Sequence, residues 1–369
     1  MIMTKTLLKG PFKADHVGSF LRPERIKIAR LQKQNGEITA DQLRSIEDEE
    51  IISLVKKQKE AGLSAVTDGE FRRAWWHFDF LSGLDGVELY ETDRGIQFNG
   101  IETKSHGVKV TGKVKFGNHP MLEDFKFLQS LAGDHIAKFT IPSPNMLFFR
   151  GNIEKEAYPE KNELFSDLVT AYQDAIKAFY AAGCRYLQLD DTSWSVFFSE
   201  KGQKQIVDKG FNSEELAELF ARCINESIEG KPEDMTITMH ICRGNFKSSY
   251  TASGGYESVS DIIFGQLKVD GLFLEFDDER SGGFEPLRYV NTHDLQIVLG
   301  LITSKYGELE DPQKIKQRIK EAAHYVDLNQ LCLSPQCGFA STEEGNLLTE
   351  EQQWNKIRHV VSIAEEIWT

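Results

Sequence analysis

The sequence contains no hydrophobic run that approaches the roughly 20 residues needed to span a bilayer. Its first residues, Met1 to Lys5, lack the long apolar core of a secretory signal peptide. Positive charge is also in short supply, since the formal net charge is -14. A nucleic acid or an anionic membrane surface would therefore be repelled. We expect a cytoplasmic protein that binds neither nucleic acids nor membranes.

Two further absences narrow the class of protein. The sequence has no Gly-x-Gly-x-x-Gly fingerprint and no Walker-type phosphate loop, which counts against nucleotide-dependent folds. Cysteines are few, odd in number and irregularly spaced, so they do not form a disulfide framework. We expect reduced thiols, some of them metal ligands. The five cysteines are Cys184, Cys223, Cys242, Cys332 and Cys337.

What the sequence does contain is a recurring order of strand and then helix. Eight such repeats favour an α/β fold, a closed parallel (β/α)8 TIM barrel, over an open doubly wound sheet. We expect residues 1–369 to form a single barrel domain. The stretch of about 86–118 alternates in polarity and is broken by turn residues, which predicts hairpins inserted after the second strand. The predicted strands are 14–19, 63–67, 137–141, 186–189, 233–238, 271–274, 296–301 and 330–333.

Side chains that bind metals stand at the carboxyl ends of these predicted strands, where barrels of this kind place their active sites. His240 and Cys242 are two residues apart in an extended segment, so they face the same side. Glu275 ends another strand and Cys337 follows the last one. Zinc prefers nitrogen and sulfur ligands and tolerates a carboxylate. We therefore predict a Zn2+ site formed by His240, Cys242, Glu275 and Cys337.

A site with two thiolates suits the binding of a third thiolate from a substrate. Metal binding lowers the pKa of a thiol, so the sulfur becomes nucleophilic near pH 7. We expect Glu275 to be the ligand that the incoming sulfur displaces most easily.

Each residue also has a simpler interpretation. A His-x-Cys pair at a strand end usually serves packing, and Cys337 could be a small buried hydrophobe. Glu275 could belong to a solvated acidic loop, and Asp190 with Asp191 could cap a helix. The argument for a metal is that all four candidate ligands fall on the same rim of the barrel.

The strand ends together resemble the catalytic half of cobalamin-independent methionine synthase. This resemblance implies a (β/α)8 barrel with zinc held by residues matching His240, Cys242, Glu275 and Cys337. It implies methyl transfer from a methyltetrahydropteroyl-polyglutamate, a folate, to the sulfur of homocysteine. The segments that carry it are His16-Val17-Gly18-Ser19-Phe20, Asp68-Gly69-Glu70, Gln188-Leu189-Asp190-Asp191, His240-Ile241-Cys242, Leu274-Glu275 and Ser334-Pro335-Gln336-Cys337-Gly338.

The resemblance also implies an amino-acid pocket. Ser19 and the neighbouring backbone would hold the homocysteine carboxylate, and Glu70 with Asp190 would hold its ammonium. Two carboxylates on one rim suit a cation independently, because they would otherwise repel each other. The simpler interpretation of Glu70 is a surface partner for Arg72 or Arg73.

The sequence departs from the family at three places. The chain is about one barrel long and lacks the long N-terminal half that helps to bind the folate. Thr303 stands where the family carries a histidine for proton transfer, and a hydroxyl cannot replace imidazole as an acid near pH 7. Residues 141–144 lack the tryptophan on which the folate ring stacks. We therefore assign no catalytic residue beyond the zinc ligands.

The expected function is zinc-dependent transfer of a methyl group to the thiol of homocysteine or a related thiol, from folate or another donor. One alternative is a thiol alkyltransferase of the same family that joins an epoxide to coenzyme M. A sulfonate substrate would require basic residues, for which Arg22, Arg72, Arg73 and Arg243 are candidates. Another alternative, supported by Thr303, is a non-catalytic protein that binds a metal or a thiol.

Overall fold

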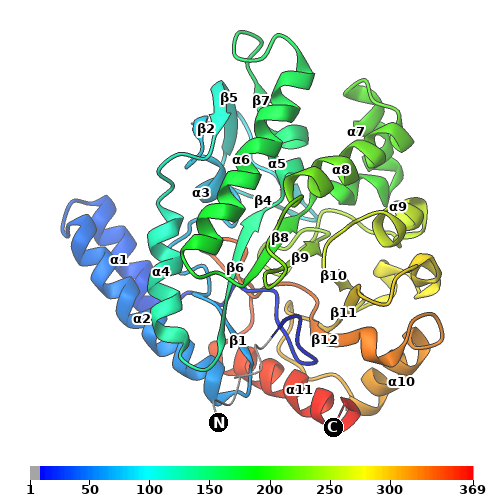
Figure 1. Cartoon of the computed structure of the whole chain (residues 1–369). Coiled ribbons are helices and arrows are strands. Elements are labelled where there is room, and N and C mark those ends of the chain that lie inside the picture. The colour runs from blue at the N-terminus through cyan, green and yellow to red at the C-terminus, as the bar shows by residue number, and fades with distance from the viewer. Residues whose placement is uncertain (1–8, 369) are drawn as a thin grey trace, which may run out of the picture.

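The computed structural model describes residues 9–368, and its centre is a curled sheet of seven parallel strands (Figure 1). Helices cover the outside of this sheet. The strands at its middle, β8 and β9, are buried at every residue, because helices cover one face and side chains fill the interior. In spatial order the strands are β1 (Ala65–Val66), β6 (Ile136–Pro142), β8 (Tyr186–Asp191), β9 (Thr236–Ile241), β10 (Gly271–Glu275), β11 (Gln296–Ile302) and β12 (Leu331–Pro335).

The eighth place in the barrel belongs to the segment around Ala14. Ala14 forms a parallel bridge with Leu333 of β12, and the imidazole Nε2 of His16 lies 3.2 Å from the carbonyl oxygen of Ala65 in β1. The prediction of a full strand at 14–19 is wrong, because only this bridge forms. The carboxylate of Asp15 accepts the backbone N–H groups of Phe12 and His16, so these groups are not available to a strand ladder. The TIM-barrel type of fold is confirmed.

Local sequence signals mark the ends of several helices. Thr39 caps α2 in a capping box with Gln42, and Gly62 follows its end with a φ of 89°. At α8 the N-cap is Asn212, whose side chain accepts the backbone N–H groups of Glu214 and Glu215. No helix within residues 9–368 combines the length and apolarity needed to cross a membrane. The helices are α1 (Glu24–Gln34), α2 (Ala40–Glu60), α3 (Phe78–Leu81), α4 (Met121–Ala132), α5 (Pro144–Arg150), α6 (Lys161–Ala181), α7 (Glu200–Asp208), α8 (Ser213–Ser227), α9 (Ser260–Gly265), α10 (Pro312–Ala322) and α11 (Glu350–Trp368).

The inserted hairpins also form, after β1. β2 (Asp85–Glu91) pairs antiparallel with β5 (His106–Lys115), and the short β7 (Asn152–Ile153) joins β5. Between them β3 (Gln97–Phe98) and β4 (Ile101–Glu102) make a small hairpin. The division of the chain into one domain stays a prediction.

The β3–β4 hairpin is fixed to the loop that follows β9. The backbone N–H of Asn99 donates to the carbonyl oxygen of Tyr250 at 2.9 Å, and the Ser249 hydroxyl donates to the carbonyl oxygen of Asn99 at 2.7 Å. The rings of Phe98 and Phe246 pack 5.4 Å apart. An insertion early in the chain therefore lies against the loop that carries the first candidate metal ligands.

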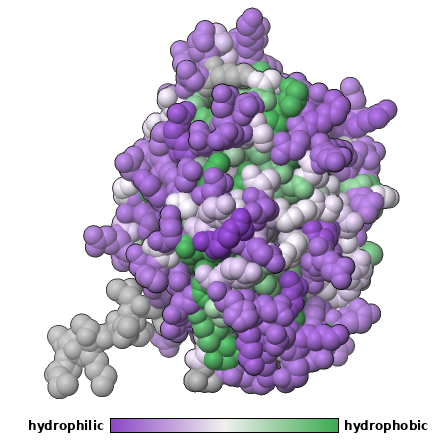
Figure 2. Space-filling model, turned by 90° about the vertical axis from the view of Figure 1, so that its right-hand side faces the viewer, coloured by the Kyte–Doolittle hydropathy of each residue, from purple (hydrophilic) through white to green (hydrophobic). Residues whose placement is uncertain are grey.

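An ion pair lies inside the barrel, well below the carboxyl ends of the strands. Lys138 is fully buried, and its Nζ lies 3.2 Å from Oδ1 of Asp15 and 4.0 Å from the centre of the Phe273 ring. The hydroxyl of Tyr186 donates to the same carboxylate. By contrast, the outer face drawn in Figure 2 is largely hydrophilic, with hydrophobic groups in small separate areas.

Candidate metal centre and its pocket

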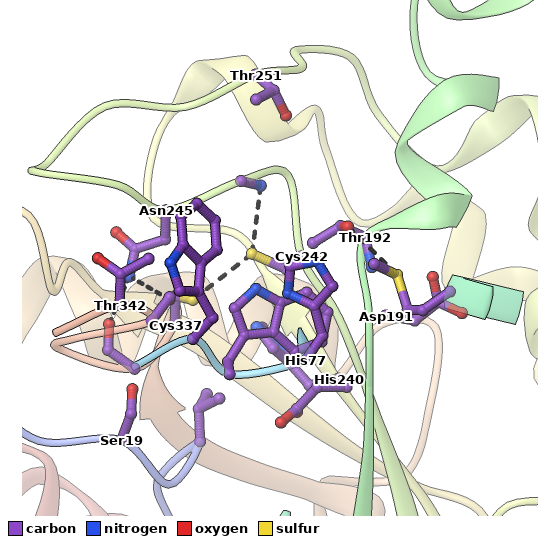
Figure 3. A pocket seen from close by; sticks show the side chains of 18 of the residues that line it. Ser19, His77, Asp191, Thr192, His240, Cys242, Asn245, Thr251, Cys337 and Thr342 are labelled. Atoms are coloured by element: carbon purple, nitrogen blue, oxygen red, sulfur yellow. Dashed lines mark hydrogen bonds between the residues drawn. The ribbon is translucent and has the colours of Figure 1, made fainter. Parts of the chain in front are cut away.

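Three of the four predicted metal ligands lie together at the carboxyl ends of the strands. His240 stands near the end of β9, Cys242 follows that strand, and Cys337 follows β12. Their ligand atoms all lie within 4.8 Å of one another, and the two Sγ atoms are 3.6 Å apart (Figure 3). All three side chains are buried, and both cysteines are free thiols. The other three cysteines are also buried but do not belong to this group.

The imidazole of His240 is held in the orientation that a metal requires. Its Nδ1 lies 3.2 Å from the carbonyl oxygen of Phe273, so Nδ1 carries the proton and donates it there. Nε2 is buried and has no hydrogen-bond partner. A histidine whose second nitrogen is fixed by a backbone carbonyl presents its free lone pair to a metal ion.

The Cys242 sulfur accepts a hydrogen bond from the backbone N–H of Gly244 at 3.2 Å. The neighbouring Cys337 thiol and burial raise the pKa of Cys242 well above its ordinary value. Two thiolates this close together therefore need a cation beside them. Gly244 has a φ of +94°, and a Cβ there would lie 2.6 Å from Oγ1 of Thr251. Only glycine fits this turn without strain.

Glu275 is not one of this group of ligand atoms. Its Oε1 accepts the backbone N–H of Arg243 at 2.6 Å, while its Oε2 is buried without a hydrogen bond. Burial alone would raise the pKa of Glu275, but the positive charges of Lys305, Arg243 and Arg280 lower it, so the carboxylate stays ionised. The simpler interpretation of a solvated loop does not fit a fully buried side chain. Its role as a metal ligand stays a prediction.

The three ligands line a cavity that the predicted substrate residues Ser19, Glu70 and Asp190 also line. Aromatic side chains form one wall of this inner cavity, and the β3–β4 hairpin supplies another part. The aromatic and hairpin residues are Trp75, Trp76, His77, Ile96 and Phe98. The structure therefore places the candidate metal ligands and the candidate amino-acid residues around one space.

Glu70 lies between a hydroxyl and a guanidinium. Oε1 accepts the Thr140 hydroxyl at 2.8 Å and lies 3.5 Å from Nη1 of Arg73, while Oε2 is buried without a partner. The sequence-based alternative of an ion pair with Arg73 is thus correct in its partner but not in its location, because both side chains are buried. Arg72 pairs elsewhere, with Asp48 and Asp124 among others.

Asp190 and Asp191 are neighbours in β8, and their side chains form hydrogen bonds with different partners. Oδ1 of Asp190 accepts from the amide of Gln188 at 2.7 Å, and burial raises the pKa of Asp190 to about 7. Asp191 instead accepts the backbone N–H and hydroxyl of Ser193 and the hydroxyl of Ser143. The N-cap of the short helix Ser193–Phe197 is Thr192 and not Asp191, so the helix-cap interpretation is wrong, although Asp191 accepts the first N–H groups of that helix. Both aspartates line the cavity.

Ser19 reaches the cavity next to the last cysteine. A Cβ on Gly338 would lie 1.9 Å from Oγ of Ser19, so the chain after Cys337 passes close to Ser19 only because it is glycine. The backbone N–H of Phe339 donates to the carbonyl oxygen of Ser19 at 3.0 Å. The amide of Asn245 donates to the carbonyl oxygen of Gly338 at 2.7 Å and so joins the loops after β9 and β12.

Some pocket residues carry no sequence signal of the kind used above. His77 lines the cavity together with His240 (Figure 3), and burial lowers the pKa of His77 to about 3, so it is neutral near pH 7. Arg150, at the end of α5, also lines the cavity. Thr303 does not line it; its backbone N–H donates to the carboxylate of Glu310. Neither His77 nor Arg150 stands at the end of a predicted strand, so the pattern of strand ends does not indicate them.

The model of the family "Cobalamin-independent synthase, Catalytic domain" matches residues 12–366. The chain belongs to this family. Its relatives include the uncharacterized protein YxjG of Bacillus subtilis, 64% identical over 98% of this chain and 96% of that protein. The methionine synthase of Sulfurisphaera tokodaii is 23% identical over 87% of this chain and 84% of the relative.

A solved structure from Listeria monocytogenes, assigned as a vitamin-B12-independent methionine synthase, is 52% identical to this chain. It superposes with a TM-score of 0.82 and covers 98% of this chain and 99% of its own. The family resemblance drawn from the strand ends is thereby confirmed, and so is the barrel that it implies.

Proposed function

We propose that this protein is a zinc-dependent methyltransferase that forms methionine from homocysteine, or methylates a closely related thiol amino acid. The observation that carries the proposal is the single cavity in which His240, Cys242 and Cys337 lie beside Glu70 and Asp190. A metal-binding group and an ammonium-binding group in one cavity suit a small molecule that has a thiol at one end and an amino group at the other. Membership of the synthase family supports the same reaction.

The residues present fit a zinc ion. His240 offers an unpartnered Nε2, and Cys242 and Cys337 offer two sulfurs 3.6 Å apart. Glu275 offers an ionised carboxylate whose Oε2 accepts no hydrogen bond and lies 3.6 Å from Nη2 of Arg280, and it is the proposed fourth ligand. Two sulfurs, one nitrogen and one oxygen form a donor set that zinc accepts. When bound, zinc would lower the pKa of the substrate thiol and so keep the sulfur nucleophilic near pH 7.

The chain's own residues would hold the rest of the amino acid. Glu70 and Asp190, one with a free oxygen and both buried, would pair with the ammonium group. An ammonium group between them would also favour the ionised form of Asp190, whose pKa burial raises. Ser19 would hold the carboxylate with the backbone beside it.

Methyl transfer then needs an in-line approach. The sulfur lone pair forms the new S–CH3 bond, the bond from methyl to its carrier breaks, and that electron pair stays on the carrier, which takes up a proton. The walls made by Trp75, His77 and the β3–β4 hairpin would keep water out and fix the angle of approach. His77 is neutral near pH 7 and therefore does not supply that proton.

The alternative of a sulfonate thiol such as coenzyme M has less support. Among the described residues, none of the four candidate arginines Arg22, Arg72, Arg73 and Arg243 lines the cavity; Arg150 does, on the side that faces a neighbouring pocket. Arg243, for example, donates to the carbonyl oxygen of Gly254 and to the hydroxyl of Tyr256. Two carboxylates at the inner end suit an ammonium and would repel a sulfonate.

Turnover tests the proposal directly. Zinc-loaded protein is incubated with L-homocysteine and a panel of methyl donors, among them 5-methyltetrahydropteroyl mono- and triglutamate, and methionine is measured by mass spectrometry. We expect methionine with at least one donor and no alkylation of coenzyme M by an epoxide. Tight binding of L-homocysteine without turnover on any donor would favour the binding-only alternative instead.

A further inference from the structure

A second chamber adjoins the inner cavity and is different in character. It has a volume of about 300 Å³ and shares Ile96, Arg150 and Thr251 with the inner cavity, so these three side chains border both spaces. Its other walls come from the segment before α7, from α7 itself and from the β3–β4 hairpin. They carry hydroxyl and amide groups at Ser195, Ser199 and Gln205. We call this space the outer chamber.

The outer chamber has two cations and no acid. None of the described residues that line it is Asp or Glu, although the chain as a whole carries 57 acidic and 43 basic residues. Arg150 and Lys201 are both exposed, and neither has a carboxylate within 4.0 Å among the described residues. Surface cations elsewhere in this chain commonly have such a partner; on α7 itself Lys204 pairs with Asp208. Two unpaired cations in one concave space attract an anion.

Arg150 is also held in place. Its Nη2 donates to the carbonyl oxygen of Thr192 at 2.7 Å, and the Ser195 hydroxyl lies 3.4 Å from the same nitrogen. These contacts use one corner of the guanidinium and leave its other N–H groups to a ligand. A planar guanidinium with free parallel donors binds a carboxylate or a phosphate in a bidentate manner.

We propose that the outer chamber binds the anionic group of the methyl donor, with Arg150 and Lys201 as the binding residues. The inference rests on the proposed methyl transfer, because it assigns the second substrate of that reaction. The donor's methyl group would lie over the cysteine pair, and its anionic end would extend past Arg150 to Lys201. The ligand chemistry is a carboxylate or phosphate; the inner cavity is assigned to the amino acid, and its carboxylates Glu70 and Asp190 have no counterpart in the outer chamber.

Equilibrium binding tests this without any turnover. Dissociation constants of 5-methyltetrahydropteroyl mono- and triglutamate are measured by calorimetry, at low and high salt, in the absence of homocysteine. We expect Lys201→Met to weaken binding about threefold to fivefold at low salt. Arg150→Met should weaken it about tenfold or more, because a charge-assisted bidentate contact is lost. In both variants the salt dependence should become shallower than in the wild type.

Two controls separate this site from the rest of the protein. Lys204→Met removes a positive charge from the same helix outside the chamber and should leave both constants unchanged. Lys201→Met should leave the affinity for L-methionine unchanged, because Lys201 does not line the inner cavity. Inorganic phosphate and glutarate are each added as a competitor of the methyl donor, and the stronger competitor is the anion that the chamber prefers. If either anion competes with the donor in the wild type but not in Lys201→Met, the result supports the site.

The failures of the two proposals differ. If wild-type protein binds none of these probes, or if both variants bind them as wild type does with the same salt dependence, the outer chamber is not an anion site. If the variants behave as expected but no donor yields methionine, the anion site stands and the methyl transfer does not.

Discussion

The Sγ atoms of Cys242 and Cys337 lie 3.6 Å apart although 95 positions separate them in the sequence. They follow β9 and β12, and two further strands, β10 and β11, lie between. In a flat sheet three strand spacings would hold these ends roughly 14 Å apart. The closure of the barrel brings them within reach of one ion, so the metal site and the fold depend on each other.

The cysteine pair gives a direct test of metal binding. We expect Cys242→Ala and Cys337→Ala each to lose zinc affinity by roughly a hundredfold or more, because one of four ligands is removed from a total of about 10–16 kcal/mol. Zinc content and competition with a chelator measure this. Cys332→Ala is the matched control, since it removes a buried thiol from β12 outside the ligand group. Full zinc content in both ligand variants would contradict the proposed site.

Asp190→Asn tests the amino-acid end of the inner cavity. The substitution keeps the shape but removes the charge that would face the ammonium, so we expect L-methionine affinity to fall at least about thirtyfold, or about 2 kcal/mol, with zinc retained. Calorimetry measures the affinity. Asp234→Asn, at an exposed carboxylate paired with Arg185, should have no effect. Undiminished binding in Asp190→Asn would remove that residue from the site.

Gly244→Ala tests the turn that aims a backbone N–H at Cys242. We expect a loss in the free energy of unfolding of about 2–4 kcal/mol, from the strain of a positive φ together with a contact of 2.6 Å to Thr251. Gly100→Ala has a similar φ of +82° but nothing within 4 Å of the added Cβ, so it should lose only the strain of about 1–2 kcal/mol. Denaturant unfolding compares the two. Equal losses would show that the packing around Gly244 is looser than described.

His16 makes the stability depend on pH. Burial, with a smaller contribution from Lys138, lowers the pKa of His16 from 6.5 to about 4 in the folded protein. Between pH 6.5 and 4 the unfolded chain therefore binds a proton at His16 that the folded chain does not. The contribution of His16 to stability is full above pH 6.5, and about 3 kcal/mol of it is lost as the pH drops to 4. The slope of the unfolding free energy against pH measures the difference in bound protons between the unfolded and folded chains, and His16→Gln should reduce this difference by up to one proton.

In that variant His77, whose pKa burial lowers to about 3, would add a slope of the same sign, whereas Asp190 and Asp277, whose pKa burial raises to about 7 and about 6, would add slopes of the opposite sign. His293→Gln, at an exposed position, serves as the control and should leave the slope as it is in the wild type. An unchanged slope in His16→Gln would mean that His16 is protonated in the folded protein.

The strand ends were predictable because their signals are local. A run of apolar residues followed by His240, Cys242 or Asp190 predicts both the strand and the residue at which it ends. The barrel places all such ends on one rim. The different partners of Asp190 and Asp191 follow from the alternation of a strand, but which partners each one meets depends on the register with β6 and β9. That register is a property of the whole sheet.

Residues placed by the tertiary structure could not be predicted in the same way. The turn at Asn99-Gly100 predicts a hairpin, yet nothing in it indicates that Ile96 and Phe98 line the metal pocket. His77 and Arg150 lie in α-helical connections outside the strand ends, and only packing brings them to the cavity. The first predicted strand forms only a bridge because the Asp15 carboxylate accepts backbone N–H groups that a strand would use. Strand propensity does not take such side-chain hydrogen bonds into account.

The hydrogen bond from the backbone N–H of Asn99 to the carbonyl oxygen of Tyr250 joins the β3–β4 hairpin to the loop that carries Cys242. That amide proton exchanges with solvent deuterium only while this hydrogen bond is open. The exchange rate of this amide therefore measures how often the β3–β4 hairpin separates from the loop after β9, whether or not the protein is turning over substrate. Slow exchange at Asn99 would mean that the hairpin seldom opens, and that a molecule bound in the inner cavity leaves only as often as it does.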